Sequence, residues 1–221
     1  MLQKTYQLVG RLIGDNPGCQ MSPPVIAMST DTRARLLAEA EQLLRRVGYA
    51  AFSYADLAAA IGIRKASIHH HFPTKQDLAA AVVDAALARF TGRLHDIEAM
   101  ESSAVARLHA YGGLFSEGCA AQLRPLCCAL AADLAALPPA IHARTRAYFD
   151  LHLVWLGRIV EAGIARREIV WSGNAAGLAV LILGSLEGGS LLGRVWRNEN
   201  EVAAGLHEIL VHIAAAPIPG G

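Results

Sequence analysis

The sequence has little of what marks several protein classes. Its four cysteines are too few and too clustered for a disulfide scaffold, and none belongs to a Cys-x-x-Cys pair. Charged residues make up only 18% of the chain and hydrophobic residues 53%, a balance that excludes disorder for most of its length. β-Branched residues are sparse beside abundant Ala and Leu, which favours helices over strands. The 221 residues are enough for one large domain or two modest ones.

Signals for export, membrane insertion and catalysis are also missing. The first residues show no charged segment followed by an apolar one, so a secretory signal is not predicted. The most apolar run, Ala175 to Leu186, stops at Glu187 after about 12 residues, short of the ~20 that a membrane-spanning helix needs. The sequence contains no Gly-rich phosphate loop and no His-Glu-x-x-His motif. We therefore expect a soluble, cytoplasmic protein that is not an enzyme, needs no cofactor and has no membrane partner.

Charge is nearly balanced overall but unevenly distributed. The net charge is +1. Residues 28–75 carry an excess of three basic residues, and residues 76–221 carry an excess of three acidic ones. A short basic segment followed by a longer acidic one suits a small anion-binding domain joined to a larger, solvated domain.

The N-terminal quarter divides into a segment without pattern and a run of short helices. Residues 1–27 hold several Gly and Pro and no sustained period, which predicts a disordered arm or an over-extended reading frame before a true start at Met28. Amphipathic spacing predicts a first helix over about residues 32–47. We expect residues 28–75 to form the first domain.

Capping signals place the next three helices. Ser53, with Asp56 three residues on, predicts the start of a second helix. A third helix is expected over about 65–72. Thr74 then caps a fourth helix that reaches about Arg93.

The remainder is also predicted to be helical, so the fold class is all-α. A ligand-binding and dimerisation domain is expected over 76–216, with a loose tail at 217–221. Its further helices are expected at about 101–120, 123–136, 139–166, 172–194 and 199–215.

Two short helices joined by Gly62-Ile63-Arg64 predict a helix-turn-helix, a motif that sets its second helix in the major groove of DNA. The stretch from about Arg35 to Leu78 resembles the DNA-binding domain of the tetracycline-repressor (TetR) family. This resemblance implies a dimeric regulator of transcription, most often a repressor that a small molecule releases from a palindromic operator in double-stranded DNA. The residues that carry it are Gly48-Tyr49, Phe52-Ser53, Asp56-Leu57-Ala58, Ile61-Gly62-Ile63, Ser67-Ile68, His71-Phe72, Lys75 and Leu78.

The resemblance also implies roles for single residues. The start of the third helix would read base edges, whereas the second-helix cap and the lysine that opens the fourth helix would lie on phosphates. The family usually has Ser where Arg64 stands and Tyr where His69 stands. Arg64 in place of Ser adds a cation that can reach guanine, and His69 in place of Tyr can still donate to phosphate. The DNA-contacting residues expected are Ser53, Arg64, Lys65, Ala66, Ser67, His69, His70, His71 and Lys75.

Two other interpretations stay open. The run His69-His70-His71 suggests a metal site, but adjacent helical residues point about 100° apart, so we expect no metal there. Redox or electrophile sensing through cysteine is the second alternative. It depends on a lowered thiol pKa. The cysteines are Cys19, Cys119, Cys127 and Cys128.

The body offers candidates for effector binding and for dimerisation. Middle helices of the body usually line the family's cavity, and they suggest a pocket with Tyr111, Phe115, Arg124, Tyr148 and Trp155. The segment from Gly173 to Gly193 is rich in small residues, which let helices approach closely. We expect this helix to form a homodimer interface, together with the helix at 199–215. The interface residues expected are Gly184, Gly188 and Leu192.

Overall fold

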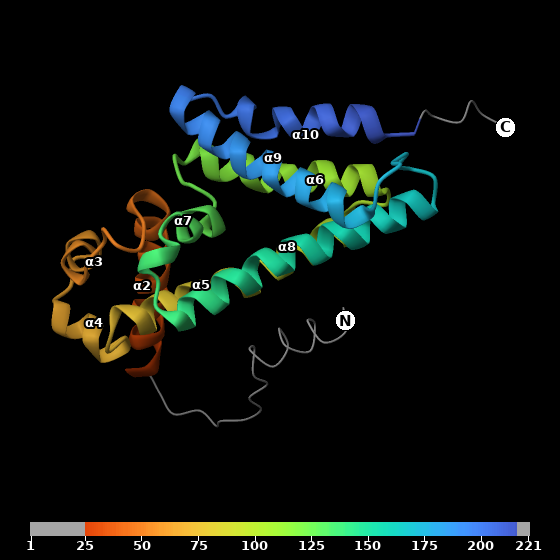
Figure 1. Ribbon diagram of the computed structural model, residues 1–221. Coiled ribbons are helices and arrows are strands. Elements are labelled where there is room, and N and C mark those ends of the chain that lie inside the picture. The colour runs from red at the N-terminus through yellow and green to blue at the C-terminus, as the bar shows by residue number, and fades with distance from the viewer. Residues whose placement is uncertain (1–24, 216–221) are drawn as a thin grey trace. The chain divides into compact units, whose positions relative to one another are not determined.

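The computed structural model describes residues 25–215, with side chains from residue 32, and this range contains helices but no strand (Figure 1). The all-α fold class is therefore confirmed. An isolated bridge pairs Ile169 with Ala214. The helices are α2 (Val25–Val47), α3 (Tyr54–Ile61), α4 (Lys65–His71), α5 (Lys75–Met100), α6 (Ala104–Ala120), α7 (Leu126–Ala132), the 3-10 helix η1 (Leu134–Ala136), α8 (Pro139–Ala165), α9 (Ala175–Trp196) and α10 (Asn200–Ile213).

The chain forms two compact units from alternating stretches of sequence. Unit 1 contains the described residues up to Arg89 together with Leu126–Tyr148, and unit 2 contains the remainder. The long helices α5 and α8 each contribute residues to both units. This division differs from the boundary expected between 28–75 and 76–216, because α7 packs on α2 and the first part of α5 belongs with the short helices.

The core of unit 1 holds α2, α3 and α4 together. Leu36 and Leu44 of α2, Leu57 of α3 and Ile68 of α4 are fully buried. α2 begins at Val25, before the predicted start, because residues 25–31 contain no Gly or Pro to interrupt it. Most of the expected arm at 1–27, and the tail at 217–221, lie outside the described residues.

Unit 2 contains close contacts between α9 and α10, and both helices also pack on α6 (Figure 1). A Cβ on Gly189 of α9 would lie 2.5 Å from the carbonyl oxygen of Val202, and one on Gly193 would lie 2.9 Å from that of Asn198. Larger residues are therefore excluded at these two positions. α9 and α10, the two helices expected at the dimer interface, therefore already pack on each other within one chain.

Two helices have lengths that the sequence patterns did not predict. α5 continues past Arg93 to Met100, because residues 94–100 contain mostly good helix formers and no Gly or Pro. The helix expected over 123–136 is instead the short α7 followed by η1, since Pro125 precludes an earlier start.

Among the described helices, α9 is long and apolar enough to cross a membrane by length and composition, a test that core helices of soluble proteins also pass. It continues past Glu187 to Trp196, beyond the apolar run recognised in the sequence.

Candidate nucleic-acid interface and effector site

The first helix of the helix-turn-helix is fixed at both ends. Ser53 Oγ accepts hydrogen bonds from the backbone N–H groups of Ala55 and Asp56, and the Asp56 carboxylate accepts one from the Ser53 N–H at 2.7 Å. The hydrogen bond from the Ser53 side chain is the main cause that lowers the pKa of Asp56. At the other end Gly62 adopts a left-handed φ of 71°, which ends α3 and starts the turn. The predicted cap at Ser53 is confirmed.

The second helix, α4, is anchored on one side and exposed on the other. Ile68 and Phe72 are buried in unit 1, whereas Lys65, Ala66 and Ser67 are exposed. The residue before α4 is Arg64, whose guanidinium carries only donors and cannot cap backbone N–H groups. The start of α4 therefore has no side-chain cap and carries two cationic side chains, those of Arg64 and Lys65, an arrangement that attracts anions.

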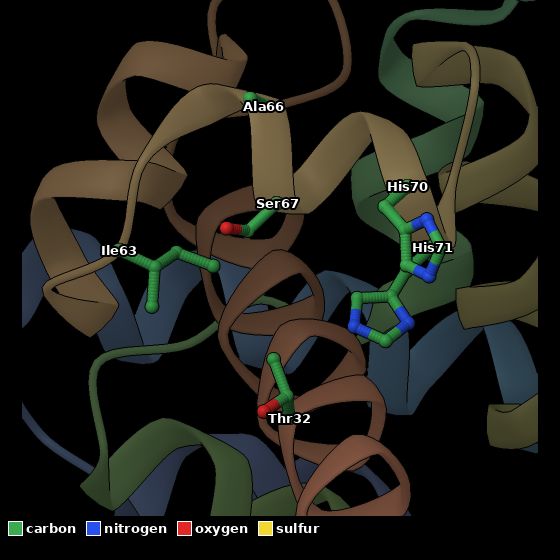
Figure 2. A pocket seen from close by; sticks show the side chains of 6 residues that line it. All are labelled: Thr32, Ile63, Ala66, Ser67, His70 and His71. Carbon is green, nitrogen blue, oxygen red and sulfur yellow. The ribbon is translucent and has the colours of Figure 1, made fainter.

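A surface hollow of about 480 Å³ lies beside the exposed side of α4 (Figure 2). Ser67, His70 and His71 contribute from α4, Ile63 from the turn and Thr32 from α2. Ala66 completes the lining. The hollow thus brings together four of the residues predicted to contact DNA, and it adds Thr32 and Ile63, which sequence reasoning missed.

His69 is oriented by contacts within unit 1. Its Nδ1–H donates to the carbonyl oxygen of Pro73 at 3.1 Å, and its ring meets the edge of Tyr54, with 4.9 Å between centroids. Tyr54 donates from its hydroxyl to the carbonyl of Phe72 at 2.8 Å, and burial raises its pKa to about 12. His70 and His71 pack against each other instead, with centroids 5.5 Å apart. Within residues 25–215 no group of three or more potential metal-binding side chains is found.

Lys75, at the start of α5, is held by aromatic rings. Its Nζ lies 4.6 Å from the ring centre of Tyr49 and 4.6 Å from that of Phe52. Burial lowers the pKa of Lys75, and the negative charges of Asp133 and Asp56 act against this shift. The ammonium group therefore has a defined place beside the helix-turn-helix.

Two further contacts complete this region. Thr74 and Asp77 form the predicted cap of α5, with the Asp77 carboxylate accepting from the Thr74 N–H at 3.0 Å. Asp133, between α7 and η1, accepts a hydrogen bond from the Ala50 N–H at 3.2 Å. Asp133 is distant in sequence, and no pattern linked it to this site.

Unit 2 contains a cluster of rings from α5, α6 and α8. Tyr111 stacks on Trp155 with centroids 5.3 Å apart, and Phe115 lies 5.4 Å from Tyr111. Phe90 stacks on His152 at 4.3 Å, and the Tyr111 hydroxyl forms a 2.6 Å hydrogen bond with His152 Nδ1. Three of the five residues expected to line the pocket therefore meet in one place, together with Phe90 and His152, which were not predicted.

The other two expected pocket residues are Tyr148 and Arg124. Tyr148 belongs to unit 1, where burial raises its pKa. Arg124 lies in the connection between α6 and α7, half-buried.

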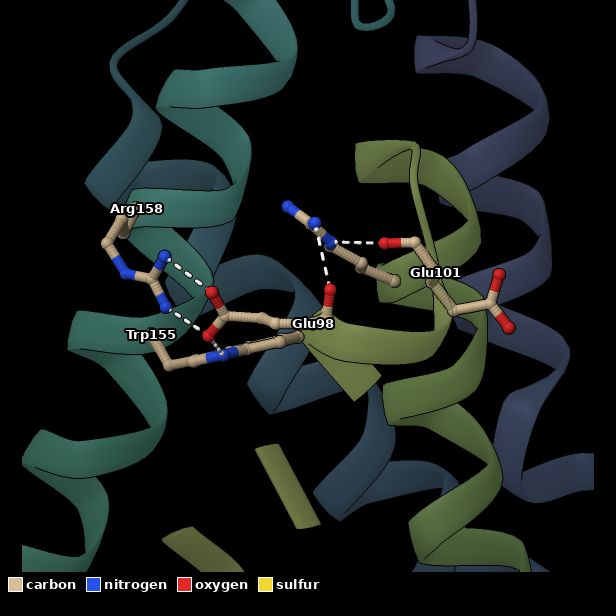
Figure 3. A network of polar contacts seen from close by, with 5 residues as sticks. Glu98, Glu101, Trp155 and Arg158 are labelled. Carbon is tan, nitrogen blue, oxygen red and sulfur yellow. Dashed lines mark hydrogen bonds and ion pairs between the residues drawn. The ribbon is translucent and has the colours of Figure 1, made fainter. Parts of the chain in front are cut away.

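A polar network borders the aromatic cluster (Figure 3). The Trp155 Nε1–H donates to Glu98 Oε1 at 2.8 Å, and the Arg158 guanidinium binds both carboxylate oxygens of Glu98. The hydrogen bond from Arg158 is the main cause that lowers the pKa of Glu98. Arg107 donates to the backbone carbonyls of Glu98 and Glu101, which stabilises the end of α5. The ion pair thus fixes Trp155 from one side.

The small-residue face of α9 is open in the single chain. A Cβ on Gly184 or Gly188 would have no described atom within 4 Å. Leu192 is 47% exposed. The other large apolar side chains exposed on α9 are Val180, Leu181, Leu191, Val195 and Trp196. The predicted interface residues therefore lie on an apolar surface that packing among the described residues leaves uncovered.

The buried cysteines give little support to a thiol sensor. Cys119 and Cys127 are buried, and Cys128 is half-buried. Burial raises the pKa of Cys119, which disfavours the reactive thiolate. Cys19 lies outside the described residues.

Comparisons with known proteins agree on one family. Residues 36–82 match the model of "Bacterial regulatory proteins, tetR family". A tetR-family transcriptional regulator from Agrobacterium tumefaciens is 32% identical, with a TM-score of 0.81, and the match covers 85% of this chain and 100% of that one. A TetR regulator from Legionella pneumophila is 30% identical, with a TM-score of 0.73 and coverage of 88% and 100%. The curated HTH-type transcriptional regulator CymR of Pseudomonas putida is 28% identical over 159 residues, 68% of this chain and 78% of CymR.

Proposed function

The chain belongs to the tetR family of bacterial regulatory proteins, and from this premise we propose that it is a repressor that a small molecule releases from a palindromic operator. It is a DNA-binding regulator of transcription, and it has no catalytic role in this proposal. The observation that carries operator recognition in this proposal is the exposed first turn of α4, where Lys65, Ala66 and Ser67 face outward from a helix anchored by Ile68. We place its action in the cytoplasm, where the DNA lies.

Contacts with DNA divide into those that read bases and those that position the protein. Arg64 and Lys65 lie at the open end of α4, and a guanidinium pairs in bidentate fashion with the O6 and N7 atoms of guanine. Ala66 and Ser67 follow on the same exposed turn, where a methyl group suits the methyl of thymine and a hydroxyl suits several base edges.

Backbone contacts come from both sides of α4. Ser53 and Lys75 open α3 and α5, where helix N-termini favour phosphate. His70 and His71 line the surface hollow and would donate to phosphate or sugar. His69 donates its Nδ1–H to the Pro73 carbonyl, so its Nε2 can donate to a phosphate only when both ring nitrogens carry hydrogen.

The protein acts as a homodimer in this proposal. Gly184, Gly188 and Leu192 lie on the uncovered apolar face of α9, which fits a matching face on a second copy. A dimer carries two copies of α4, and two-fold symmetry in the protein corresponds to a palindrome in the DNA. Once one copy of the helix-turn-helix is bound to its half-site, the dimer raises the effective concentration of the other copy at the second half-site. Each copy alone can therefore bind weakly.

The dimer leaves the operator if an effector favours a state in which the spacing of the two α4 helices no longer matches the spacing of the two half-sites. The best candidate site is the aromatic cluster around Tyr111, Phe115 and Trp155, because it combines rings with a buried hydrogen-bonding pair. Tyr148 and Arg124 remain predictions as pocket residues.

Selection of binding sites from a random DNA pool tests this function. We expect enrichment of a palindrome whose half-sites each contain a guanine read by Arg64. Arg64→Ala should relax the preference at that position and cost about 1–3 kcal/mol of binding free energy. Arg166→Ala, which removes an exposed cation of unit 2, is the matched control and should leave preference unchanged. Enrichment of no sequence, or of a single site without a repeat, would contradict the proposal.

A further inference from the structure

The ring cluster of unit 2 contains one aromatic side chain that differs from the rest. Tyr111, Phe115, His152 and Trp155 are all buried, whereas Phe90 is only partly buried. Phe90 nevertheless stacks closely on His152, with 4.3 Å between centroids and 29° between planes. One face of a buried imidazole is therefore covered by a ring that also reaches the surface.

Polar groups in the cluster are arranged for a ligand without charge. Burial lowers the pKa of His152 to about 3, so its imidazole is neutral at physiological pH. Among the contacts described for the cluster, the charged groups are Glu98 and Arg158, which bind each other through two hydrogen bonds. An ionised ligand would lose its hydration here and gain no open counter-ion from this pair.

We propose that the effector is an uncharged, planar aromatic compound that replaces the Phe90 ring on the face of His152 and hydrogen-bonds to the Tyr111–His152 pair. This inference rests on the proposed function and names the class of its effector. A phenyl ring that leaves and an aromatic ring that enters have similar volumes, so the surrounding packing is preserved. Offset stacking stabilises both arrangements.

The same exchange provides a route to regulation. Phe90 lies on α5, and α5 begins with Lys75 beside the helix-turn-helix. A ligand that displaces Phe90 therefore acts on the helix that carries a proposed phosphate contact. The shift in operator affinity can be no larger than the ratio of the ligand's affinities for the two states of the protein.

Three probes that share one ring test the class of ligand. Benzyl alcohol is neutral, benzoate is an anion and benzyltrimethylammonium is a cation. Each is titrated into the full-length protein alone, with the melting temperature and tryptophan fluorescence as readouts. We expect benzyl alcohol to bind at least about tenfold more tightly than either charged probe, because of their desolvation cost. Equal or tighter binding of a charged probe would overturn the proposal.

Two alanine variants test the position of the ligand. Phe90→Ala removes the ring that competes for His152, so benzyl alcohol should bind about tenfold more tightly than to the wild type and should raise the melting temperature. Phe115→Ala is the matched control, because Phe115 lies in the same cluster with its ring centroid 6.0 Å from His152 and not stacked on it. Equal gains in both variants, or none in Phe90→Ala, would show that Phe90 does not occupy the effector's place.

A separate measurement distinguishes this inference from the proposed function. Binding of the palindrome is measured without any probe, so failure there refutes the repressor and leaves the probe titrations valid. Where the palindrome binds, benzyl alcohol should weaken binding in the wild type and cyclohexylmethanol, which lacks the aromatic ring, should do so about tenfold less effectively. Release by cyclohexylmethanol at the same concentration would overturn the requirement for an aromatic ring.

Discussion

The ammonium nitrogen of Lys75 lies 4.6 Å from the centre of the Phe52 ring, and the ring of Tyr49 holds it at the same distance. A cation above two aromatic faces loses much of the conformational freedom that lysine otherwise has. The proposed phosphate contact therefore uses a charge that is already in position. The same two rings belong to the loop between the end of α2 and the start of α3.

Replacement of Lys75 should weaken DNA binding without changing its specificity. Lys75→Ala removes one phosphate contact, so affinity should fall nearly equally for operator and random DNA, and the salt slope should decrease by about one. Fluorescence anisotropy over a range of salt concentrations measures both. Arg166→Ala serves again as the control. A variant that loses only specificity, with its salt slope unchanged, would place Lys75 away from phosphate.

Asp133 should oppose DNA binding through its charge. Its carboxylate acts on Lys75 and accepts the Ala50 N–H, and asparagine retains an acceptor for that hydrogen bond. Asp133→Asn should therefore leave the fold intact and strengthen binding to all DNA by about two- to fivefold at low salt, an effect that high salt removes. Asp150→Asn, an acidic residue of unit 2, is the comparison. Unchanged affinity at low salt would show that Asp133 has only a structural role.

Two neighbouring glycines of α9 should respond differently to leucine. Gly188 has open space where a Cβ would be, so Gly188→Leu should yield a folded monomer with weak operator binding. A Cβ at position 189 would lie 2.5 Å from the Val202 carbonyl oxygen, so Gly189→Leu should prevent folding of unit 2. Sedimentation and circular dichroism separate the two outcomes. A normal dimer from Gly188→Leu would remove this face of α9 from the interface.

Acid should destabilise the protein through His152. The folded chain keeps His152 neutral down to a pKa of about 3, whereas in the unfolded chain histidine takes up its proton near pH 6.5. Between these two pH values the unfolded state binds more protons than the folded state. The contribution of neutral His152 to the free energy of unfolding is therefore complete above pH 6.5 and declines as the pH falls below it. Melting temperatures at pH 7 and pH 5 should differ less in His152→Leu than in the wild type. His95→Leu, at an exposed histidine of the same unit, should retain the wild-type difference.

Local signals in the sequence predicted the helix-turn-helix closely. The caps at Ser53 and Thr74 and the break at Gly62 between α3 and α4 all follow from residues within one or two turns of each other. Such features depend on short-range hydrogen bonds and on backbone sterics. Sequence alone therefore determines them well.

Long-range relationships were not predictable in the same way. Asp133 reaches Ala50 because α7 packs on α2, and Phe90 meets His152 because α5 and α8 share a cluster. No periodicity encodes such pairs, since each depends on how distant helices pack. The extent of α5 was also underestimated, because Arg93 carries no stop signal and the helix ends only at Met100.

The uncapped start of α4 has a consequence for how the binding preference can change. The positions that would read bases, Arg64 to Ser67, take no part in the hydrophobic core, which holds α4 through Ile68 and Phe72. Substitutions there should cost little stability, since surface changes usually stay within about 0.5 kcal/mol. Recognition is thereby modular: the same scaffold can be reprogrammed to a new operator by libraries at four adjacent codons, without compensating changes elsewhere.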